Sequence, residues 1–180
     1  MRIVAGQYRG KKLFSPNTDN IRPTSERARE AIFNILNSRL GSDYSKIHLL
    51  DVFAGTGAFG YEGLSRGMAS VTFVDKDVKP AQKNAKLFSK EQEKISFVTA
   101  DASKLPKAMK KYDLVFCDAP YAKGLSEKAL SGLAAGDWLA DGAICIVETR
   151  NNEQFALPEN FALIDERIYG LAKISFLRYK

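Results

Sequence analysis

Short apolar runs of strand length alternate along the chain with segments of helical spacing. Five runs are rich in β-branched and aromatic residues, as buried strands are: 48–53, 70–75, 95–99, 113–118 and 143–148. Helical spacing begins at residue 58 and recurs in three later segments: 78–88, 103–110 and 127–135. This alternation favours right-handed βαβ units, so we predict an α/β fold with a mostly parallel sheet and helices on both faces.

The two ends of the chain depart from this rhythm. Residues 161–169 and 171–179 are strand-like and leave no room for a helix between them, so they should form an antiparallel hairpin and complete a seven-stranded sheet. Near the start, the segment RPTSERAREAIFNIL carries an apolar stripe at helical spacing. We expect Thr24 or Ser25 to cap this helix and Gly41 to end it.

A glycine-rich turn joins the run at 48–53 to the helix that follows it. Gly55, Gly57 and Gly60 fit the spacing G-x-G-x-x-G, in which missing Cβ atoms let the backbone turn sharply, approach a ligand and pack the helix on its strand. The pattern predicts a nucleotide cradle, and a purely structural turn is the alternative. If the cradle is correct, Gly57→Val should abolish ligand binding by filling space that the ligand needs.

Asp51 indicates which ligand the turn holds. It lies four residues before Gly55, where an acid is badly placed for the pyrophosphate of a dinucleotide, since that anion prefers uncharged N–H groups and a helix N-terminus. A cationic ligand suits the position better. S-adenosylmethionine carries a sulfonium and an ammonium group and no phosphate, and we therefore predict it as the cofactor.

Further acids follow the next predicted strands. Asp75, Asp101 and Asp118 lie at or just past strand ends, and ligands of open α/β sheets bind outside those carboxyl ends. Asp75 is spaced to take the two ribose hydroxyls. Asp101 could accept a hydrogen bond from an adenine amino group, or it could cap the helix that begins at Ser103; the sequence leaves both open.

The residues Asp118, Ala119, Pro120 and Tyr121 form the most informative motif. An amine on a purine or pyrimidine ring is a poor nucleophile because its lone pair is delocalised into the ring. The Asp118 carboxylate and the Ala119 carbonyl can both accept hydrogen bonds from one NH2, while Tyr121 stacks on the base and Pro120 fixes the turn. The motif predicts methyl transfer to a base amine, with an ordinary strand-capping turn as the alternative.

Composition sets the outer limits. The 180 residues suffice for one compact domain, and without a run of about eighteen apolar residues we expect a cytoplasmic protein. Cys117 and Cys145 lie in apolar runs and should be buried; with His48 as the only histidine, we expect neither a metal site nor a hydrolase.

The net charge of +6 matters through its placement, because the basic excess lies at the front of the chain. Cations interleaved with glycine and tyrosine predict a hairpin that contacts a nucleic acid, with a solvated face as the alternative. We expect residues 1–22 to form this extension and residues 23–180 the catalytic domain. The predicted RNA contacts are Arg2, Arg9, Lys11, Lys12, Arg22, Thr24 and Arg27.

Taken together, these motifs resemble the class I methyltransferases, and most closely the bacterial 16S rRNA guanine-N2 methyltransferases of the RsmD type. The similarity covers nearly the whole chain: MRIVAGQYRGKKL, RPTSERAREAIFNIL, LLDVFAGTGAFGYEGLSRG, VTFVDKD with Asn84 downstream, LVFCDAPY and IYGLAKISFLRYK. The resemblance implies a Rossmann-like fold, and a monomer that methylates a guanine N2 in 16S rRNA of the assembling small subunit. One departure is Ala119, where the family has proline; because that position acts through its carbonyl, we expect the chemistry to survive.

The resemblance also assigns the site residues. Asp118 to Tyr121 would hold the target guanine. The cofactor would lie against three groups of residues: Asp51, Phe53, Ala54, Gly55, Thr56 and Gly57 at its methionine end, Asp75 and Lys76 at the ribose, and Asp101 and Ala102 at the adenine.

Three alternatives stay open. A nicotinamide-dependent dehydrogenase would share the glycine pattern but gives no reason for Asp51. An adenine-N6 methyltransferase acting on DNA or RNA uses the same amine chemistry. A non-catalytic RNA-binding protein would explain the basic front but not the acids at the strand ends.

Overall fold

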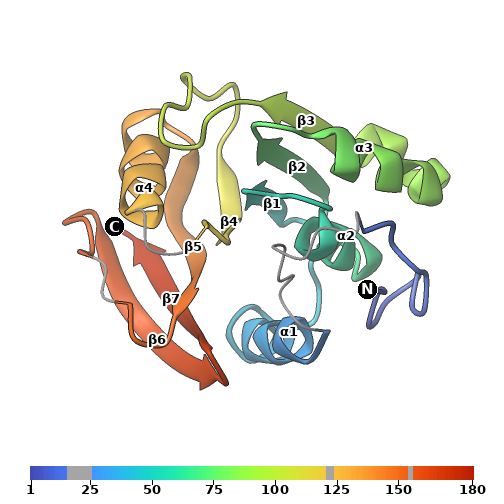
Figure 1. The fold of residues 1–180 in the computed structure, drawn as a ribbon, viewed down its shortest axis with the longest axis horizontal. Helices are drawn as coiled ribbons and strands as arrows, with labels where there is room; N and C mark the ends of the chain where they lie inside the picture. The colour runs from blue at the N-terminus through green and yellow to red at the C-terminus, as the bar shows by residue number, and fades with distance from the viewer. Residues whose placement is uncertain (16–25, 121–123, 154–155) are drawn as a thin grey trace.

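In the computed structural model, residues 1–15, 26–120, 124–153 and 156–180 are described. These residues form one seven-stranded sheet in the order β3-β2-β1-β4-β5-β7-β6 (Figure 1). The strands are β1 (His48–Val52), β2 (Ser70–Asp75), β3 (Ile95–Thr99), β4 (Tyr112–Cys117), β5 (Leu139–Arg150), β6 (Phe161–Tyr169) and β7 (Ala172–Tyr179). The first five are parallel, and β7 is antiparallel to both neighbours, which confirms the predicted sheet and its C-terminal hairpin.

The strand order reverses direction between β1 and β4. From β1 the chain builds outward through β2 and β3 on one side, then returns to add β4 and β5 on the other. In open α/β sheets such a reversal leaves a crevice outside the carboxyl ends of the two central strands, and ligands bind there. The topology therefore places the predicted ligand edge beyond Val52 and Cys117.

Helices cover both faces of the sheet. They are α1 (Glu26–Leu40), α2 (Ala58–Ser65), α3 (Lys79–Ala85), the 3₁₀ helix η1 (Lys86–Lys94) and α4 (Leu125–Ala135). Among the described residues, the buried apolar side chains fall into two clusters. One contains residues of α1, α2, α3 and η1, and the other contains those of α4, so the first four elements pack on one face and α4 on the opposite one.

A column of aromatic rings fixes α1 and α2 to the centre of the sheet. Phe59 of α2 stacks on Phe116 of β4 with ring centroids 3.9 Å apart, and Phe33 of α1 stacks on Phe59 at 5.0 Å. All three rings are buried. Aromatic pairs of this kind stabilise a fold beyond the effect of the apolar area that they bury. They therefore hold α2 and the turn before it rigidly against the strand ends.

The N-terminal segment, residues 1–15, docks on the α2 side of the molecule (Figure 1). Arg2 and Lys12 form an antiparallel bridge, as expected for a hairpin-like segment. Ile3 and Leu13 are buried in the core. A Cβ on Gly6 would lie 1.9 Å from the Ser65 carbonyl oxygen, so only glycine permits this approach to the end of α2. Residues 1–15 are thus packed against the domain rather than extended from it.

Three local predictions, for Gly41, the two cysteines and His48, are confirmed. Gly41 follows α1 with φ +80° and its N–H donates to the Asn37 carbonyl at 3.0 Å, so it ends the helix as expected. Cys117 and Cys145 are buried, and burial raises the pKa of both thiols. His48 has a structural partner, since its Nδ1 lies 2.8 Å from Ser70 Oγ. None of the helices in the described ranges is long and apolar enough to cross a membrane.

One helix prediction is wrong and another is confirmed with a different end. No helix forms over residues 103–110. Pro106 lacks an N–H, its carbonyl accepts from Trp138 Nε1 at 2.8 Å, and the Ala108 N–H donates to the Gly136 carbonyl at 2.8 Å. These bonds tie the segment to the turn between α4 and β5. The helix expected over 78–88 ends at Ala85 and continues as η1.

Candidate functional site

Backbone hydrogen bonds gather the predicted site at the carboxyl ends of the central strands. The Ala54 N–H donates to the Val74 carbonyl at 3.1 Å, which ties the start of the glycine turn to the end of β2. On the other side of β1, the Asp118 N–H donates to the Val52 carbonyl at 3.4 Å. The turn, Asp75 and Asp118 therefore lie side by side at one edge of the sheet, as their sequence positions predict.

The glycine turn combines an open side and a packed side. A Cβ on Gly55 would meet no atom within 4 Å, whereas one on Gly60 would lie 2.3 Å from the Phe73 ring. Gly60 therefore allows α2 to pack on β2, the neighbour of the strand that the sequence pattern indicated, and Gly55 leaves open space beside its backbone. Phe53 has φ +60°, a left-handed conformation that is uncommon for a bulky residue and marks the turn as held under constraint.

The structure corrects the reasoning behind one predicted variant. A Cβ on Gly57 would approach Tyr61 at 2.7 Å and Phe73 at 2.8 Å, and the residue has φ +77°. A side chain there would enter the protein core rather than the ligand space. Gly57→Val would therefore damage the fold, whereas a side chain at Gly55 would enter open space.

Asp51 is buried beneath the turn, with only 3% of its surface exposed. Its Oδ2 accepts the Gly60 N–H at 2.9 Å and so caps the first turn of α2, for which no cap from Gly57 is available. Burial raises the pKa of Asp51 to about 8, and the nearby charge of Asp75 adds to this effect. Its predicted contact with a cofactor cation stays a prediction.

Asp75 joins the end of β2 to the glycine turn. Its Oδ2 accepts the Gly55 N–H at 2.9 Å and its Oδ1 accepts the Asp77 N–H at 3.1 Å. The side chain is partly exposed. Carboxylate and turn therefore form one polar surface at the strand ends, where the ribose is predicted to bind.

Asp101 lies beyond β3 at the same edge. Its Oδ1 accepts from the Ser103 N–H at 2.9 Å and from Ser103 Oγ at 2.7 Å, and its Oδ2 pairs with Lys76 Nζ at 2.9 Å. Hydrogen bonds from Ser103 and then Lys76 lower the pKa of Asp101. Because no helix follows, Asp101 closes a tight turn and the helix-capping alternative is wrong. Ala102 is buried in the cluster beneath α4.

The amine-binding motif follows β4 directly. Asp118 is half-buried, Ala119 is buried and Pro120 is exposed; Tyr121 lies outside the described residues. Asp118 thus follows the end of β4, one strand away from the glycine turn that follows β1. Its predicted contact with a base amine stays a prediction.

The predicted RNA contacts are not all in one place. Arg9 and Lys12 are exposed on the N-terminal segment, and Arg27 is exposed on α1. Arg2 Nε pairs with Glu26 at 3.0 Å, and Lys11 Nζ donates to the Leu87 carbonyl at 2.6 Å. Arg22 and Thr24 fall outside the described residues.

Two buried polar residues have structural roles that the sequence does not predict, although Asn84 belongs to the family resemblance. Asn84 donates through Nδ2 to the Thr56 carbonyl at 2.9 Å and the Phe14 carbonyl at 3.0 Å, and its Oδ1 accepts the Phe14 N–H at 2.7 Å. Glu62 accepts the N–H groups of Val4 and Ala5 at 2.7 and 3.0 Å. Both tie the N-terminal segment to the elements around the glycine turn. For Glu62, the signal in the sequence is one acid among the small and apolar residues of 58–65.

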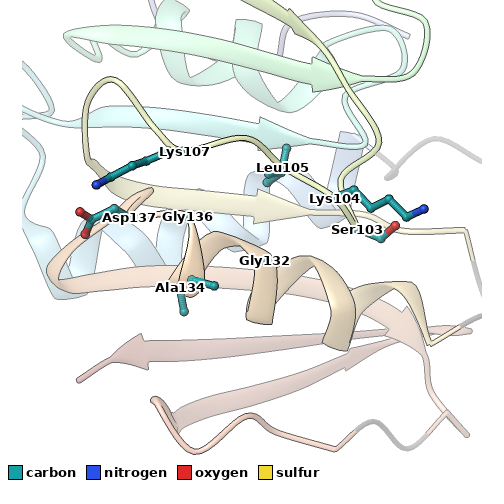
Figure 2. A pocket seen from close by; sticks show the side chains of 9 residues that line it. Ser103, Lys104, Leu105, Lys107, Gly132, Ala134, Gly136 and Asp137 are labelled. Atoms are coloured by element: carbon teal, nitrogen blue, oxygen red, sulfur yellow. The ribbon is translucent and has the colours of Figure 1, made fainter.

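A separate hollow lies between α4 and the segment after β3 (Figure 2). It has a volume of about 440 Å³, with Ser103 and Lys104 near one end and Lys107 and Asp137 near the other. It contains none of the predicted site residues. In the part of the chain that the structure describes, no group of three or more His, Cys, Asp or Glu side chains could hold a metal ion.

The whole chain is similar to known proteins. The family described as "Conserved hypothetical protein 95" matches residues 1–178. The ribosomal RNA small subunit methyltransferase D of Haemophilus influenzae is 34% identical over 100% of this chain and 93% of the relative. The protein of that name from Escherichia coli is 35% identical over 94% and 85%. The solved structure of the Escherichia coli protein yhhF is 30% identical, with a TM-score of 0.83 over 100% and 98%.

These similarities and the sheet topology confirm the predicted Rossmann-like methyltransferase fold, and the dehydrogenase and the non-catalytic protein are wrong as alternatives. The chain is a methyltransferase, and S-adenosylmethionine is its cofactor. It belongs to the family described as "Conserved hypothetical protein 95", the RsmD type of class I methyltransferases.

Proposed function

We propose that this protein transfers a methyl group from S-adenosylmethionine to the exocyclic N2 amine of a guanine in 16S rRNA while the small ribosomal subunit assembles. Two relatives at 34% and 35% identity are ribosomal RNA small subunit methyltransferases, which supports an rRNA substrate. The observation that carries the proposal is the place of Asp118. It stands at the end of β4, bonded through its N–H to the strand that leads into the glycine turn.

The cofactor and the amine bind on opposite sides of β1. Gly55 leaves open space beside Asp75, and this side holds the cofactor. When bound, S-adenosylmethionine supplies an electrophilic methyl group on a positively charged sulfur. Asp118 and the Ala119 carbonyl hold the amine on the other side. The protein thus brings donor and acceptor together across β1, and such positioning lowers the barrier without any covalent intermediate.

Asp118 acts on the amine by accepting a hydrogen bond rather than by removing a proton first. An N2 amine is conjugated to its ring, and two acceptors on its N–H groups localise the lone pair on nitrogen. The N–H becomes acidic only after the nitrogen has attacked the methyl group, so a strong base is unnecessary. Ala119 contributes a main-chain oxygen, which its methyl side chain leaves unchanged from proline.

The first test is Asp118→Ala. Turnover on 16S rRNA should fall by about a hundredfold or more, because the amine loses its main acceptor. Affinity for S-adenosylmethionine, measured by calorimetry, should stay within about twofold. Asp141→Ala, which removes an exposed acid from the opposite end of β5, serves as the control. Turnover of Asp118→Ala within about threefold of the unchanged protein would show that another group activates the nitrogen.

A further inference from the structure

A row of exposed lysines lies outside the segments that the sequence assigns to RNA. We propose that α3 and η1 join the N-terminal segment, residues 1–15, in one RNA-binding face that grips the phosphate backbone beside the target base. The proposal rests on an rRNA substrate and adds to it the surface that binds the strand. In Figure 1 the N-terminal segment and the helices α3 and η1 lie together at the same end of the sheet.

The lysines of this face follow the helix. Lys79, Lys83 and Lys86 are spaced by four and three residues, which places them on one side of α3 and its continuation. All three are exposed. Lys90 and Lys94 follow on η1 and are exposed too, after the non-helical backbone at Phe88. A row of exposed lysines along a helix can follow a row of phosphates.

Direct contacts join this row to the N-terminal segment. Lys83 Nζ lies 3.2 Å from the centre of the Phe14 ring, and Lys11 Nζ donates to the Leu87 carbonyl at 2.6 Å. Asn84 holds the Phe14 backbone through both of its side-chain polar atoms. The Tyr8 ring packs edge-on against Phe88, with centroids 4.8 Å apart. The two basic segments therefore form a single rigid surface rather than two separate patches.

The net positive charge of the chain is concentrated in the two segments that form this face. Residues 1–15 and 79–94 hold nine basic and two acidic residues, a net charge of +7, whereas the whole chain carries +6. The rest of the chain is therefore slightly negative. One of the two acids, Glu91, is 9% exposed and turned inward, where it accepts from Tyr8 at 3.2 Å and pairs with Lys94 at 2.8 Å. A concentrated field of one sign favours a polyanion over a mixed-charge protein partner.

The face is also continuous with the cofactor side of the crevice. Asn84, which fixes Phe14, donates to the carbonyl of Thr56 within the glycine turn. Lys79, at the start of α3, lies four residues after Asp75. Phe14 keeps 39% of its surface exposed, so a ring is available for stacking with an unpaired base at the edge of the basic surface. A strand held here would pass close to the bound cofactor.

The test replaces Lys79, Lys83 and Lys86 together by glutamine. Each phosphate contact contributes about −0.7 to the slope of log affinity against log salt concentration for a single strand. The triple variant should therefore make this slope shallower by about 2. Binding is measured with oligouridylate and with 16S rRNA at several NaCl concentrations. The control variant replaces Lys107, Lys111 and Lys128 by glutamine. These lysines lie outside this face, and their replacement removes the same amount of charge. Affinity for S-adenosylmethionine should not change in either variant.

The outcomes separate this proposal from the function it rests on. A reduced slope in the α3 variant alone supports the face, whichever base or atom is methylated, because phosphate contacts carry no sequence information. An unchanged slope, or an equal reduction in the control variant, would overturn it. In that case guanine methylation by the unchanged protein could still be observed, and the RNA would have to bind elsewhere.

Discussion

At the scale of single residues, Asp51 has a structural role that the hydrogen bonds show and a predicted contact with the cofactor. Its carboxylate is buried, accepts the Gly60 N–H and has a pKa raised to about 8 by burial. Between its ordinary pKa near 4 and about 8, the folded protein holds a proton that the unfolded chain lacks. Stability therefore falls as the pH rises through this window and levels off above it.

Asp51→Asn should separate these two roles. Asparagine keeps an oxygen for the Gly60 N–H but never ionises, so the variant should gain stability over the unchanged protein as the pH rises, by at least ~1 kcal/mol above pH 8. Affinity for S-adenosylmethionine should fall about tenfold if the carboxylate meets the cofactor cation. Urea denaturation across pH, with calorimetric titration beside it, measures both. A stability difference that does not depend on pH would contradict the buried, protonated state.

At the scale of elements, the glycine turn has an open side at Gly55 and a packed side at Gly57 and Gly60. The sequence pattern predicted the turn, its strand and its helix, because the G-x-G-x-x-G spacing and the apolar runs are local signals. The sequence pattern could not tell which glycine faces open space and which faces the core. That depends on Tyr61 and Phe73, whose rings occupy the space beside Gly57.

Gly55→Ala tests the open side of the turn. Its methyl group enters empty space at the strand ends and should reduce affinity for S-adenosylmethionine about tenfold. Because φ is +52° at this position, alanine should also lower the free energy of unfolding by about 1 kcal/mol. Gly170→Ala is the matched control, since Gly170 has φ +62° and open surroundings in the distant hairpin. Equal cofactor affinity in both variants would place the ligand away from Gly55.

Other elements show where local patterns stop being informative. The spacing of residues 103–110 resembles a helix, but the backbone there bonds to Gly136 and Trp138, more than twenty residues away. In the same way, the partners of Asn84 and Glu62 in the N-terminal segment lie 57 to 70 residues earlier in the chain. Contacts over such separations are set by the assembled sheet, and no short window of sequence contains them.

At the scale of the whole molecule, the N-terminal segment is part of the core as well as of the charged surface. Ile3 and Leu13 are buried, and the backbone of Val4 and Ala5 satisfies the fully buried Glu62. Sequence reasoning treated residues 1–22 as a separate extension. If they were separate, a protein without residues 1–14 would fold and bind the cofactor normally. The packing of Ile3 and Leu13 instead predicts that the deletion destabilises the fold.

Deletion of residues 1–14 should lower the melting temperature markedly. Each of the two buried apolar side chains contributes about 1.5–3 kcal/mol, and the deletion also leaves the Glu62 carboxylate without its backbone donors. Scanning calorimetry provides the measurement, with Arg9→Gln and Lys12→Gln as a variant that removes charge but no packing. A melting temperature unchanged by the deletion would show that the segment is only appended to the domain.

The central claim is the chemical identity of the product. Unmodified 16S rRNA, free or in small-subunit particles, is incubated with the protein and S-adenosylmethionine carrying a deuterated methyl group, then digested to nucleosides and analysed by mass spectrometry. We expect the label in N2-methylguanosine at one position, and its loss in Asp118→Ala. Label in N6-methyladenosine, or in guanosine methylated on another atom, would contradict the account.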